Sequence, residues 1–491
     1  MSVQRADQAP PAAGRRQGPM LAVLLTAMFM AQFDFFVVNV AAPSLARDLR
    51  AGPAALELIV GGYAFSYASG MITGGRLGDL FGYRRLFVLG MLGFALASLL
   101  CGISANPPEL VLARLVQGFT ASLMVPQVLA VITASVPASA RPRAIGWYGA
   151  ASGLGSIAGQ VLGGALLAAN VFGLGWRVIF LVNVPIGVVA SLLAARLLPL
   201  LRPGRRARLD LLGAGGIALS LALALVPLTL GHSAGWPAWA WICLALAVPA
   251  ALLTGHRLRA LAARGGMPVL DPDLLRVPSY LAGLGANIAF MAYFGSFMFT
   301  LTLLLQGGLG LTALDAGLVF APMGALFTTT ALLGHALVAR YGLRVVAFGG
   351  GLTALGLLLL ALHLHPGMGL PWVVGSLALV GAGNGLVLPQ LIGAALRRIQ
   401  PARAGTGSAM LSTAQQFAGA AGVALIGGVF FTVLGPAQPP GGYPGAMRVA
   451  ALIDIGLVAA VIVAIGFHQR ADRSQVRSRA GDGEGKESVR E

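Results

Sequence analysis

The chain has 491 residues, of which 57% are hydrophobic and only 10% are charged. Soluble globular proteins normally carry about 25% charged residues, so this composition excludes a water-soluble enzyme, a coiled coil and a disordered scaffold. The net charge of +17 would suit nucleic-acid binding, but the placement of the basic residues, described below, argues against that partner. Two cysteines in separate apolar runs and six histidines without metal-ligand spacing predict neither a disulfide framework nor a metal site.

Long apolar runs recur along the whole chain. A transmembrane helix needs about 20 mostly apolar residues, whereas a β-barrel would show alternating segments of about 10 residues. The first run is longer than the apolar region of a signal peptide and thirteen more follow, so we expect no cleaved signal. The sequence therefore predicts an all-α integral membrane protein. Its fourteen spans are expected near residues 20–42, 54–75, 86–104, 109–133, 143–168, 176–198, 209–230, 237–255, 279–305, 313–339, 344–363, 371–396, 405–434 and 446–468.

The basic residues fall mostly on one side of these spans. With the N-terminus in the cytoplasm, 28 of the 33 basic residues lie in the tails and cytoplasmic junctions, and four lie on the opposite side. This asymmetry indicates that both termini are cytoplasmic. It predicts contact with anionic membrane lipids and not with nucleic acid. Because 32 of the basic residues are arginine, which is typical of a GC-rich bacterial genome, we expect the bacterial cell (plasma) membrane.

Matches at one sequence offset indicate a duplicated six-span unit. Parallel duplicated halves are a known transporter design, and the offset leaves the seventh and eighth spans as an insert. The matching pairs, each 260 residues apart, are Gly82 with Gly342, Arg84 with Arg344 and Arg143 with Arg403. The predicted organisation is a disordered cytoplasmic tail at 1–18, an N-terminal six-helix bundle at 19–199, two inserted helices with basic linkers at 200–275, a C-terminal six-helix bundle at 276–468 and a disordered cytoplasmic tail at 469–491.

Four motifs occur in a consistent order. They are GRLGDLFGYRR (75–85), FDFFVVNVAAP (33–43), RLVQG (114–118) and GWRVIFLVNVPIG (175–187). With these motifs the chain resembles, over residues 20–468, the major facilitator superfamily and within it the fourteen-span drug:proton antiporters. The resemblance implies two six-helix bundles with two extra central helices. It also implies multidrug or antibiotic efflux by a monomer that needs no cofactor beyond a proton gradient.

The fifth span departs from the family pattern. Antiporters usually carry Gly-Pro before x-x-Gly-Gly, whereas this chain has GQVLGG (159–164). Gln160 lacks the fixed φ of proline and retains a backbone donor. The helix is therefore expected to kink less at this point, or Gln160 to face the transport pathway.

Asp34 and Arg114 are the candidates for proton coupling. A carboxylate deep in a span is costly and is a functional candidate by default. Asp34 lies roughly 12 Å from the outer end of the first span, and Arg114 lies roughly 8 Å from the outer end of the fourth. The resemblance implies that these two spans pack together, so we expect the side chains to meet. A carboxylate balanced between burial and a cation can bind and release a proton, and the alternative is a structural ion pair.

The loop after the second span is a candidate conformational latch, formed by Gly75, Asp79, Gly82, Arg84 and Arg85. Its spacing would let Asp79 meet an arginine or a helix N-terminus across the interface between the halves. The alternative is a set of solvated loop charges.

Polar and aromatic side chains within the spans are candidates for a substrate cavity. Aromatic and methionine surfaces suit flat, apolar ligands, but packing and interhelical hydrogen bonds use the same residues. The cavity candidates are Asn39, Tyr63, Gln117, Gln160, Asn287, Phe290, Phe294, Phe297, Asn384, Gln415 and Gln416.

Two further acidic residues have different interpretations. Asp454 lies near the middle of the last span, where it is either a second proton site or a packed, partnered carboxyl group. Asp315 near the start of the tenth span is interpreted as charge at a helix N-terminus.

The sequence favours a proton-coupled exporter of lipophilic or cationic drugs that works by alternating access. A proton symporter or metabolite carrier on the same scaffold is the alternative, because the fifth-span motif is altered. A membrane-embedded lipid-modifying enzyme is a remote alternative, since it would need clustered His, Asp or Glu residues. No catalytic residue and no ATP-binding loop is predicted.

Overall fold

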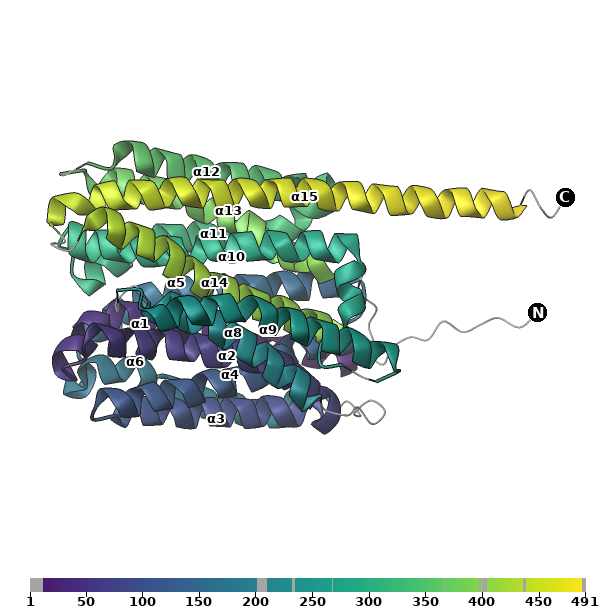
Figure 1. Ribbon diagram of the computed structural model, residues 1–491, viewed down its shortest axis with the longest axis horizontal. Coiled ribbons are helices and arrows are strands. Elements are labelled where there is room, and N and C mark those ends of the chain that lie inside the picture. Colours follow the sequence, from purple (N-terminus) through teal and green to yellow (C-terminus); the bar gives the residue numbers. More distant parts are fainter. Residues whose placement is uncertain are drawn as a thin grey trace.

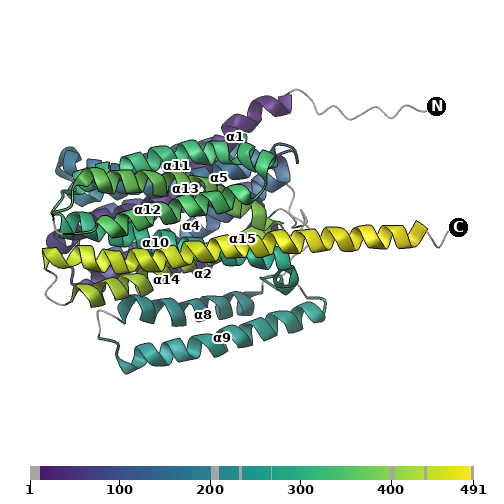
Figure 2. The ribbon, with the colours of Figure 1, turned by 90° about the horizontal axis from the view of Figure 1, so that it is seen from above.

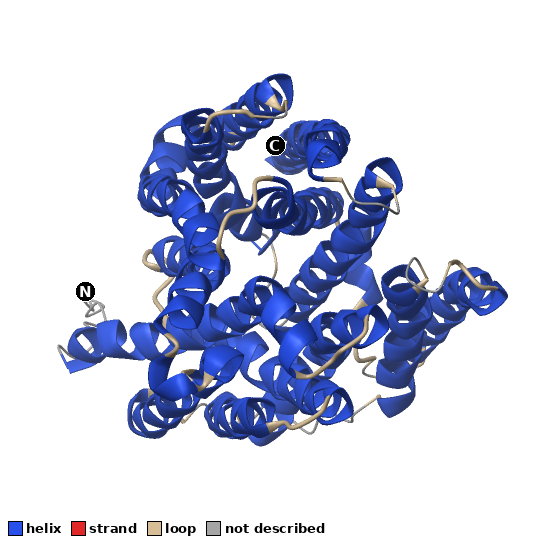
Figure 3. Cartoon of the chain, turned by 90° about the vertical axis from the view of Figure 1, so that its left-hand side faces the viewer, coloured by secondary structure: helices blue, strands red, loops and turns tan. Residues whose placement is uncertain are grey.

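The computed structural model describes residues 12–200, 210–231, 235–266, 268–365, 367–396, 399, 404–435 and 439–487. Within these residues the chain is helical and no strand occurs. The long helices run side by side along one axis, and the start of α1 and the end of α15 lie toward the same end of the molecule (Figures 1 and 2). Seen along that axis, the helices form one closely packed assembly (Figure 3).

The N-terminal half comprises α1 to α7. The run expected at 176–198 forms α6 and α7, which adjoin at Val182, a residue with helical φ and ψ of −61° and −27°. The helices are α1 Ala12–Asp48, α2 Pro53–Phe81, α3 Tyr83–Ile103, α4 Pro107–Ser135, α5 Arg141–Ala169, α6 Val178–Leu181 and α7 Asn183–Leu197, with the short 3-10 turns Val171–Gly173 and Gly175–Arg177 between α5 and α6.

The C-terminal half comprises α10 to α15. A 3-10 turn, η3 (Pro272–Arg276), leads into it, and a π-helical turn, η4 (Leu304–Gly308), extends α10. The helices are α10 Pro278–Leu303, α11 Ala313–Tyr341, α12 Arg344–His363, α13 Leu370–Leu396, α14 Ala404–Leu434 and α15 Tyr443–Glu487, and a 3-10 turn, η6 (Pro440–Gly442), precedes α15.

Two inserted helices lie at the edge of the molecule. α8 (Leu211–Leu230) and α9 (Ala238–Ala263) pack against one another, and α8 contacts α2 and α14. Figure 2 shows this pair outside the two halves. Pro227 and Pro249 lie inside these helices and do not end them. The insert therefore adds a hairpin to the outside of the bundle, although the sequence resemblance implied two extra central helices.

Each of the fourteen runs expected from the sequence contains helix. Twelve segments are long and apolar enough to cross a membrane, among the residues that the structure describes. The two runs that do not qualify are α2 and α8. α2 is 29 residues long but rich in glycine, serine and tyrosine, and α8 contains a shorter apolar stretch, Leu212–Leu228. The count of fourteen spans therefore stays a prediction.

The internal repeat is visible at the two junctions that the sequence comparison matched. Gly82 follows α2 and Gly342 follows α11, with φ of +93° and +65°. These φ values lie in the region that glycine adopts readily and other residues avoid. Each glycine N–H donates to the carbonyl four residues earlier, at 2.9 Å to Gly78 and 2.8 Å to Val338. Both halves therefore end their second helix with a glycine of positive φ and the same backbone hydrogen bond.

A second element of the repeat was not found in the sequence analysis. The Gln127 side chain in α4 donates to the carbonyl of Gly74 in α2 at 2.8 Å. In the C-terminal half the amide of Gln390 in α13 lies against Gly334 in α11, so that a Cβ at Gly334 would stand 2.7 Å from its nitrogen. Each glutamine follows a proline within its helix. The remaining sequence anchor, Arg403, lies outside the described residues.

The two halves meet through equivalent helices. α5 contacts α11 and α13, while α14 contacts α2 and α4. Two side-chain contacts cross this interface near the middle of the molecule. The Phe36 and Phe294 rings lie edge to face with centroids 6.0 Å apart, and Tyr148 is hydrogen bonded to Ser412.

The ends of the chain differ from the predicted disordered tails. α1 begins at Ala12, within the predicted tail 1–18, and α15 continues to Glu487 through most of the predicted tail 469–491. The C-terminal segment contains no proline, and its five Arg and three Glu residues have good helix propensity, whereas its three Gly residues oppose a helix. A polar segment of this composition can therefore extend the preceding helix. Residues 1–11 and 488–491 lie outside the described residues.

Candidate functional site

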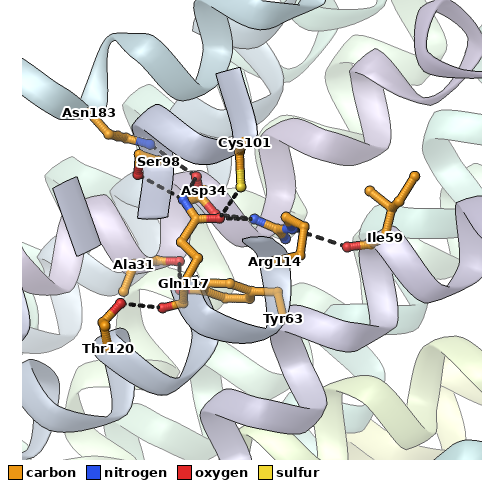
Figure 4. A network of polar contacts seen from close by, with 10 residues as sticks. All are labelled: Ala31, Asp34, Ile59, Tyr63, Ser98, Cys101, Arg114, Gln117, Thr120 and Asn183. Carbon is orange, nitrogen blue, oxygen red and sulfur yellow. Dashed lines mark hydrogen bonds and ion pairs between the residues drawn. The ribbon is translucent and has the colours of Figure 1, made fainter. Parts of the chain in front are cut away.

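Asp34 lies in α1 and its side chain is completely buried. The apolar side chains before and after it in α1 pack into the N-terminal half and carry Asp34 away from lipid and water. Arg114 in α4 is also completely buried, and its Nη1 donates to Asp34 Oδ2. The expected meeting of these two side chains is therefore present in the structure (Figure 4).

Arg114 is held by more than its ion pair. Its Nε donates to the carbonyl of Ile59 in α2 at 3.0 Å, and its Nη1 also donates to Gln117 Oε1 at 2.8 Å. The guanidinium carbon lies 4.4 Å from the centre of the Tyr63 ring, at a distance typical of a cation–π contact. Tyr63 is fixed in turn because its hydroxyl donates to the carbonyl of Ala31 at 2.9 Å.

Two amide side chains complete the surroundings of the Asp34 carboxylate. Gln117 Nε2 donates to Asp34 Oδ1 at 2.8 Å, and Asn183 Nδ2 in α7 donates to the same oxygen at 2.9 Å. Gln117 is linked further to Ser98 Oγ at 2.8 Å and to the Cys101 thiol at 3.5 Å. We call Asp34, Arg114, Gln117 and Asn183 the Asp34 cluster. It joins α1, α4 and α7 (Figure 4).

Sequence reasoning missed Asn183, Ser98 and Cys101. Asn183 lies inside the motif GWRVIFLVNVPIG, so the motif was a signal that could have identified it. Tyr63 and Gln117 had been predicted to line the substrate cavity. The structure places both against Asp34 and Arg114 instead, where Gln117 binds the carboxylate and Tyr63 stacks on the guanidinium group.

In the Asp34 cluster the charges of Asp34 and Arg114 offset one another, and most of their polar atoms have hydrogen-bond partners. A buried ion pair is tolerated only when its other lone pairs and protons also find partners. Both Asp34 oxygens accept hydrogen bonds, while Arg114 Nη2 has no hydrogen-bond partner within the described part of the chain. A proton that binds to Asp34 would cancel the charge on which these donors converge. The arrangement can therefore bind a proton and respond to it through three helices.

The predicted latch loop is ordered differently from the expectation. Asp79 Oδ1 accepts a hydrogen bond from the Tyr83 hydroxyl at 2.7 Å, and its Oδ2 lies 3.8 Å from Arg76 Nη1. Both partners belong to the same half, because Asp79 and Arg76 are separated by one turn of α2. Within the described residues these contacts of Asp79 stay in its own half, and its expected contact with the other half stays a prediction.

Arg76, which was not among the predicted latch residues, contacts a segment that is distant in the sequence. It donates to the carbonyls of Pro268 at 2.6 Å and Val269 at 3.3 Å, in the segment that joins α9 to the C-terminal half. Arg84 donates to the carbonyl of Ala195 near the end of α7. Arg85 is exposed, and Gly75 is buried.

Several cavity candidates form hydrogen bonds within the C-terminal half. Asn287 donates to the Gly283 carbonyl at 2.8 Å and accepts from Gln415 at 2.8 Å. Asn384 is hydrogen bonded to the Tyr293 hydroxyl and to Thr353 at 3.1 Å. These amides connect neighbouring helices in this arrangement, which is the packing role that the sequence left open.

The aromatic stripe on α10 lies at the centre of the molecule and is buried. Phe290 and Phe294 stack with centroids 6.0 Å apart, and Phe297 packs on Tyr293 at 5.9 Å. Because Phe294 also contacts Phe36, the stripe borders the interface between the halves. It is therefore available to an apolar ligand if the halves separate.

The remaining cavity candidates are Gln160, Gln416 and Asn39. Gln160 is completely buried in α5, and neither atom of its amide has a hydrogen-bond partner within the described residues. Gln416 is buried and Asn39 is half-buried. α5 runs continuously from Arg141 to Ala169 through Gln160, and the weaker kink expected there stays a prediction. Among the residues that the structure describes, no group of His, Cys, Asp and Glu has the arrangement of a metal site.

Comparisons with known proteins agree with this architecture. The sequence profile of the Major Facilitator Superfamily matches residues 24–423. The chain is 36% identical to a probable actinorhodin transporter of Streptomyces coelicolor, over 87% of this chain and 74% of that protein. It is 35% identical to the cephamycin export protein CmcT of Amycolatopsis lactamdurans, over 83% of each.

A solved structure shares the fold. The crystal structure of the human organic anion transporter MFSD10 (TETRAN) superimposes with a TM-score of 0.62, covering 92% of this chain and all of that one, at 18% identity. The profile match spans most of the chain, and two bacterial relatives exceed 30% identity over most of their length. The chain therefore belongs to the Major Facilitator Superfamily.

Proposed function

We propose that this protein is a proton-coupled exporter of lipophilic or cationic drugs or antibiotics in the bacterial cell membrane, and that Asp34 carries the proton. The observation that carries the proposal is the Asp34 cluster, a buried carboxylate bound by one cation and two amides. Export is supported by the bacterial relatives, which are named as a transporter of actinorhodin and an exporter of cephamycin.

The coupling follows from the charges in the cluster. When a proton forms an O–H bond on Asp34, the ion pair with Arg114 is lost, and the amides of Gln117 and Asn183 face a neutral group. These contacts join α1 to α4 and α7, so protonation changes the energy of their packing. A ligand that favours one arrangement of the halves is thereby linked to the binding of a proton.

The loop of Gly75, Asp79, Gly82, Arg84 and Arg85 is proposed to stabilise one arrangement of the halves. Its support is the set of contacts that Arg76 and Arg84 make with the segment after α9 and with α7. We propose that both termini are cytoplasmic, that the monomer is the working unit, and that the gradient is the energy source without a cofactor. The substrate is proposed to bind between the halves beside Phe36, Phe290 and Phe294.

The test uses proteoliposomes that contain the purified full chain and a fluorescent lipophilic cation. A pH gradient is imposed, and the wild type is compared with Asp34→Asn. We expect the wild type to move the dye against the direction of proton flow. We expect the rate of this movement to be at least tenfold lower in Asp34→Asn. Asp315→Asn is the matched control, because Asp315 is an exposed carboxyl group at the start of α11.

Each result has a defined meaning. Dye movement along the direction of proton flow would replace the exporter with a symporter, the alternative that the altered fifth-span motif favours. Full gradient-driven movement in Asp34→Asn would remove Asp34 from the coupling mechanism. Equal losses in Asp34→Asn and Asp315→Asn would mean that the effect is not specific to the Asp34 cluster.

A further inference from the structure

A second carboxyl group, Asp454, is buried within the C-terminal half. It lies in α15 with 0% of its surface exposed. Its Oδ1 lies 2.6 Å from the Ser296 hydroxyl in α10, and its Oδ2 has no hydrogen-bond partner within the described residues. This environment is the opposite of that of Asp34, whose oxygens accept three donors.

Among the residues that the structure describes, no cation forms an ion pair with Asp454. The helices that contact α15 are α10, α12 and α14, together with the turns η4 and η6. α10, α14 and both turns contain no Lys, Arg or His, and in α12 such residues occur only at the two ends, Arg344 and His363. The nearest basic residue in α15 itself is Arg448, which donates to the carbonyls of Ala361 and Leu364.

The other titratable group that faces Asp454 is Tyr293 in α10, which interacts with it electrostatically. The Tyr293 hydroxyl is hydrogen bonded to Asn384, so no hydrogen bond links it to Asp454. An ionised carboxylate without a cation in a low-dielectric interior is very costly, and such a group normally takes up a proton.

The hydrogen bonds around Ser296 indicate where the proton lies. A serine hydroxyl has one hydrogen to donate. The Ser296 oxygen is within hydrogen-bond distance of the helix carbonyls of Ala292, at 2.9 Å, and Tyr293, at 2.8 Å, as well as of Asp454. If the serine donates to a carbonyl, the 2.6 Å contact requires Asp454 to be the donor. With a proton on Oδ1, Asp454 donates to Ser296 while Ser296 donates to a carbonyl, and Oδ2 is left as an uncharged carbonyl oxygen.

We infer that Asp454 is a second proton-binding site, separate from Asp34, and that it holds its proton as a neutral carboxylic acid in the arrangement seen here. The proton comes from water and forms the O–H bond that Asp454 donates to Ser296. Each half of the protein then contains one buried carboxyl group, of which one is ion-paired and the other is neutral.

The test is infrared spectroscopy of the purified full chain in lipid nanodiscs at neutral pH. The spectrum of Asp454→Asn is subtracted from that of the wild type, and the same is done with Asp34→Asn. We expect the first difference to contain the C=O stretching band of a protonated carboxylic acid and the second to lack it. Asparagine resembles the neutral acid in shape and can also donate to Ser296, so the variant is expected to fold.

Loss of ionised carboxylate bands in Asp454→Asn, without the acid band, would overturn the inference. If that variant does not fold, Ser296→Ala provides the test, because removing the acceptor should shift the acid band, whereas an unshifted spectrum would contradict the assignment. The measurement needs neither substrate nor a gradient. Its outcome is therefore independent of whether the proposed export is correct.

Discussion

At the scale of single residues, Asp34 and Asp454 show two ways to bury a carboxyl group. Asp34 is surrounded by donors from α4 and α7, including one cation, whereas Asp454 has one hydroxyl partner. The ion pair with Arg114 offsets the free-energy cost of burying ionised Asp34. If one partner is removed, however, the other is left as an uncompensated buried charge. Arg114 is the residue on which this dependence can be measured.

Arg114→Leu should destabilise the protein, because it leaves Asp34 buried without its cation. Removing one partner of a buried ion pair costs about 3–5 kcal/mol, so we expect a clearly lower melting temperature in detergent. The double variant Asp34→Asn/Arg114→Leu should recover part of this loss, since the unpaired charge is gone. Thermal unfolding followed by tryptophan fluorescence measures both effects.

Arg85→Leu is the control for that experiment, because Arg85 is an exposed arginine in the first turn of α3. It should leave the melting temperature nearly unchanged. A double variant that is less stable than Arg114→Leu would contradict the account, since it would mean that Asp34 does not depend on Arg114 for its burial.

The Asp34–Arg114 contact was predicted because residue counts place both side chains at a similar depth and the family resemblance implies that the first and fourth spans pack together. It did not predict Asn183, because an amide in a span gives no indication of its partner. For the same reason Tyr63 and Gln117 were assigned to the cavity. Polar side chains within a span look alike in the sequence, and only the packing of the helices separates them.

At the scale of helices, α5 is the element that joins the two halves over its length. It lies against α1 within its own half and against α11 and α13 of the other. Near its end, a Cβ added at Gly164 would lie 2.3 Å from the carbonyl oxygen of Ala313 in α11. The backbone of α11 cannot move aside as a flexible side chain can. The close contact between α5 and α11 therefore depends on the absence of a Cβ at Gly164.

Gly164→Ala should therefore disfavour the arrangement in which α5 and α11 touch. We expect reduced dye transport in proteoliposomes while the protein still folds, because the clash is relieved when the halves separate. Gly146→Ala is the control in the same helix, since its added Cβ would meet nothing within 4 Å. In that position alanine should be neutral or stabilise by about 0.5–1 kcal/mol. Equal transport by both variants would show that this contact does not control the movement.

The inserted hairpin is connected to α2 by polar contacts. Asp210 caps α8 through Gly213 N–H at 2.9 Å and pairs with Arg257 of α9 at 2.7 Å. The Val269 N–H donates to Asp210 at 3.4 Å, while its carbonyl accepts from Arg76. The insert, the segment after it and the loop at the end of α2 therefore form one connected group.

Arg76→Gln should loosen the segment around Pro268 and Val269, because two hydrogen bonds to its carbonyls are lost. Arg264 lies just before this segment and is exposed, so limited digestion with trypsin should cleave there faster in the variant. Arg85→Gln removes a neighbouring charge without these bonds and should digest like the wild type. An unchanged cleavage rate in Arg76→Gln would argue that Arg76 does not hold the segment.

Helix positions were largely predictable because apolar runs of membrane-spanning length permit little else. The division between α6 and α7 and the continuation of α15 past residue 468 were not predicted. The first is a local break at Val182, and the second is a polar helix that extends the last span. Hydrophobicity signals neither of them.

At the scale of the whole molecule, the halves share a turn at Gly82 and Gly342 but differ in chemistry. Within the described part of the C-terminal half, the Asp34 cluster has no counterpart and Asp454 has no ion pair. A duplicated scaffold thus retains its backbone while each half acquires a different polar site. The inserted hairpin lies outside this duplication, and its relation to the membrane is the remaining topological question.

The number of spans can be decided by the position of Ala238, an exposed residue at the start of α9. If α8 and α9 both cross, Ala238 lies on the outer face, because the chain termini are proposed to be cytoplasmic. α8 has 20 residues, about 30 Å at 1.5 Å per residue, which matches the bilayer core. We therefore expect Ala238→Cys, in a chain with Cys243 replaced by serine, to react with an impermeant maleimide in intact cells.

Two control positions show how a cysteine on each face of the membrane reacts. Phe172→Cys marks the outer face, since Phe172 is 94% exposed between α5 and α6, and Arg85→Cys marks the inner face and should react only after permeabilisation. Reaction of Ala238→Cys like Phe172→Cys supports fourteen spans. If Ala238→Cys reacts like Arg85→Cys, α8 and α9 stay on the cytoplasmic side, and the twelve-span topology of the two halves is complete without them.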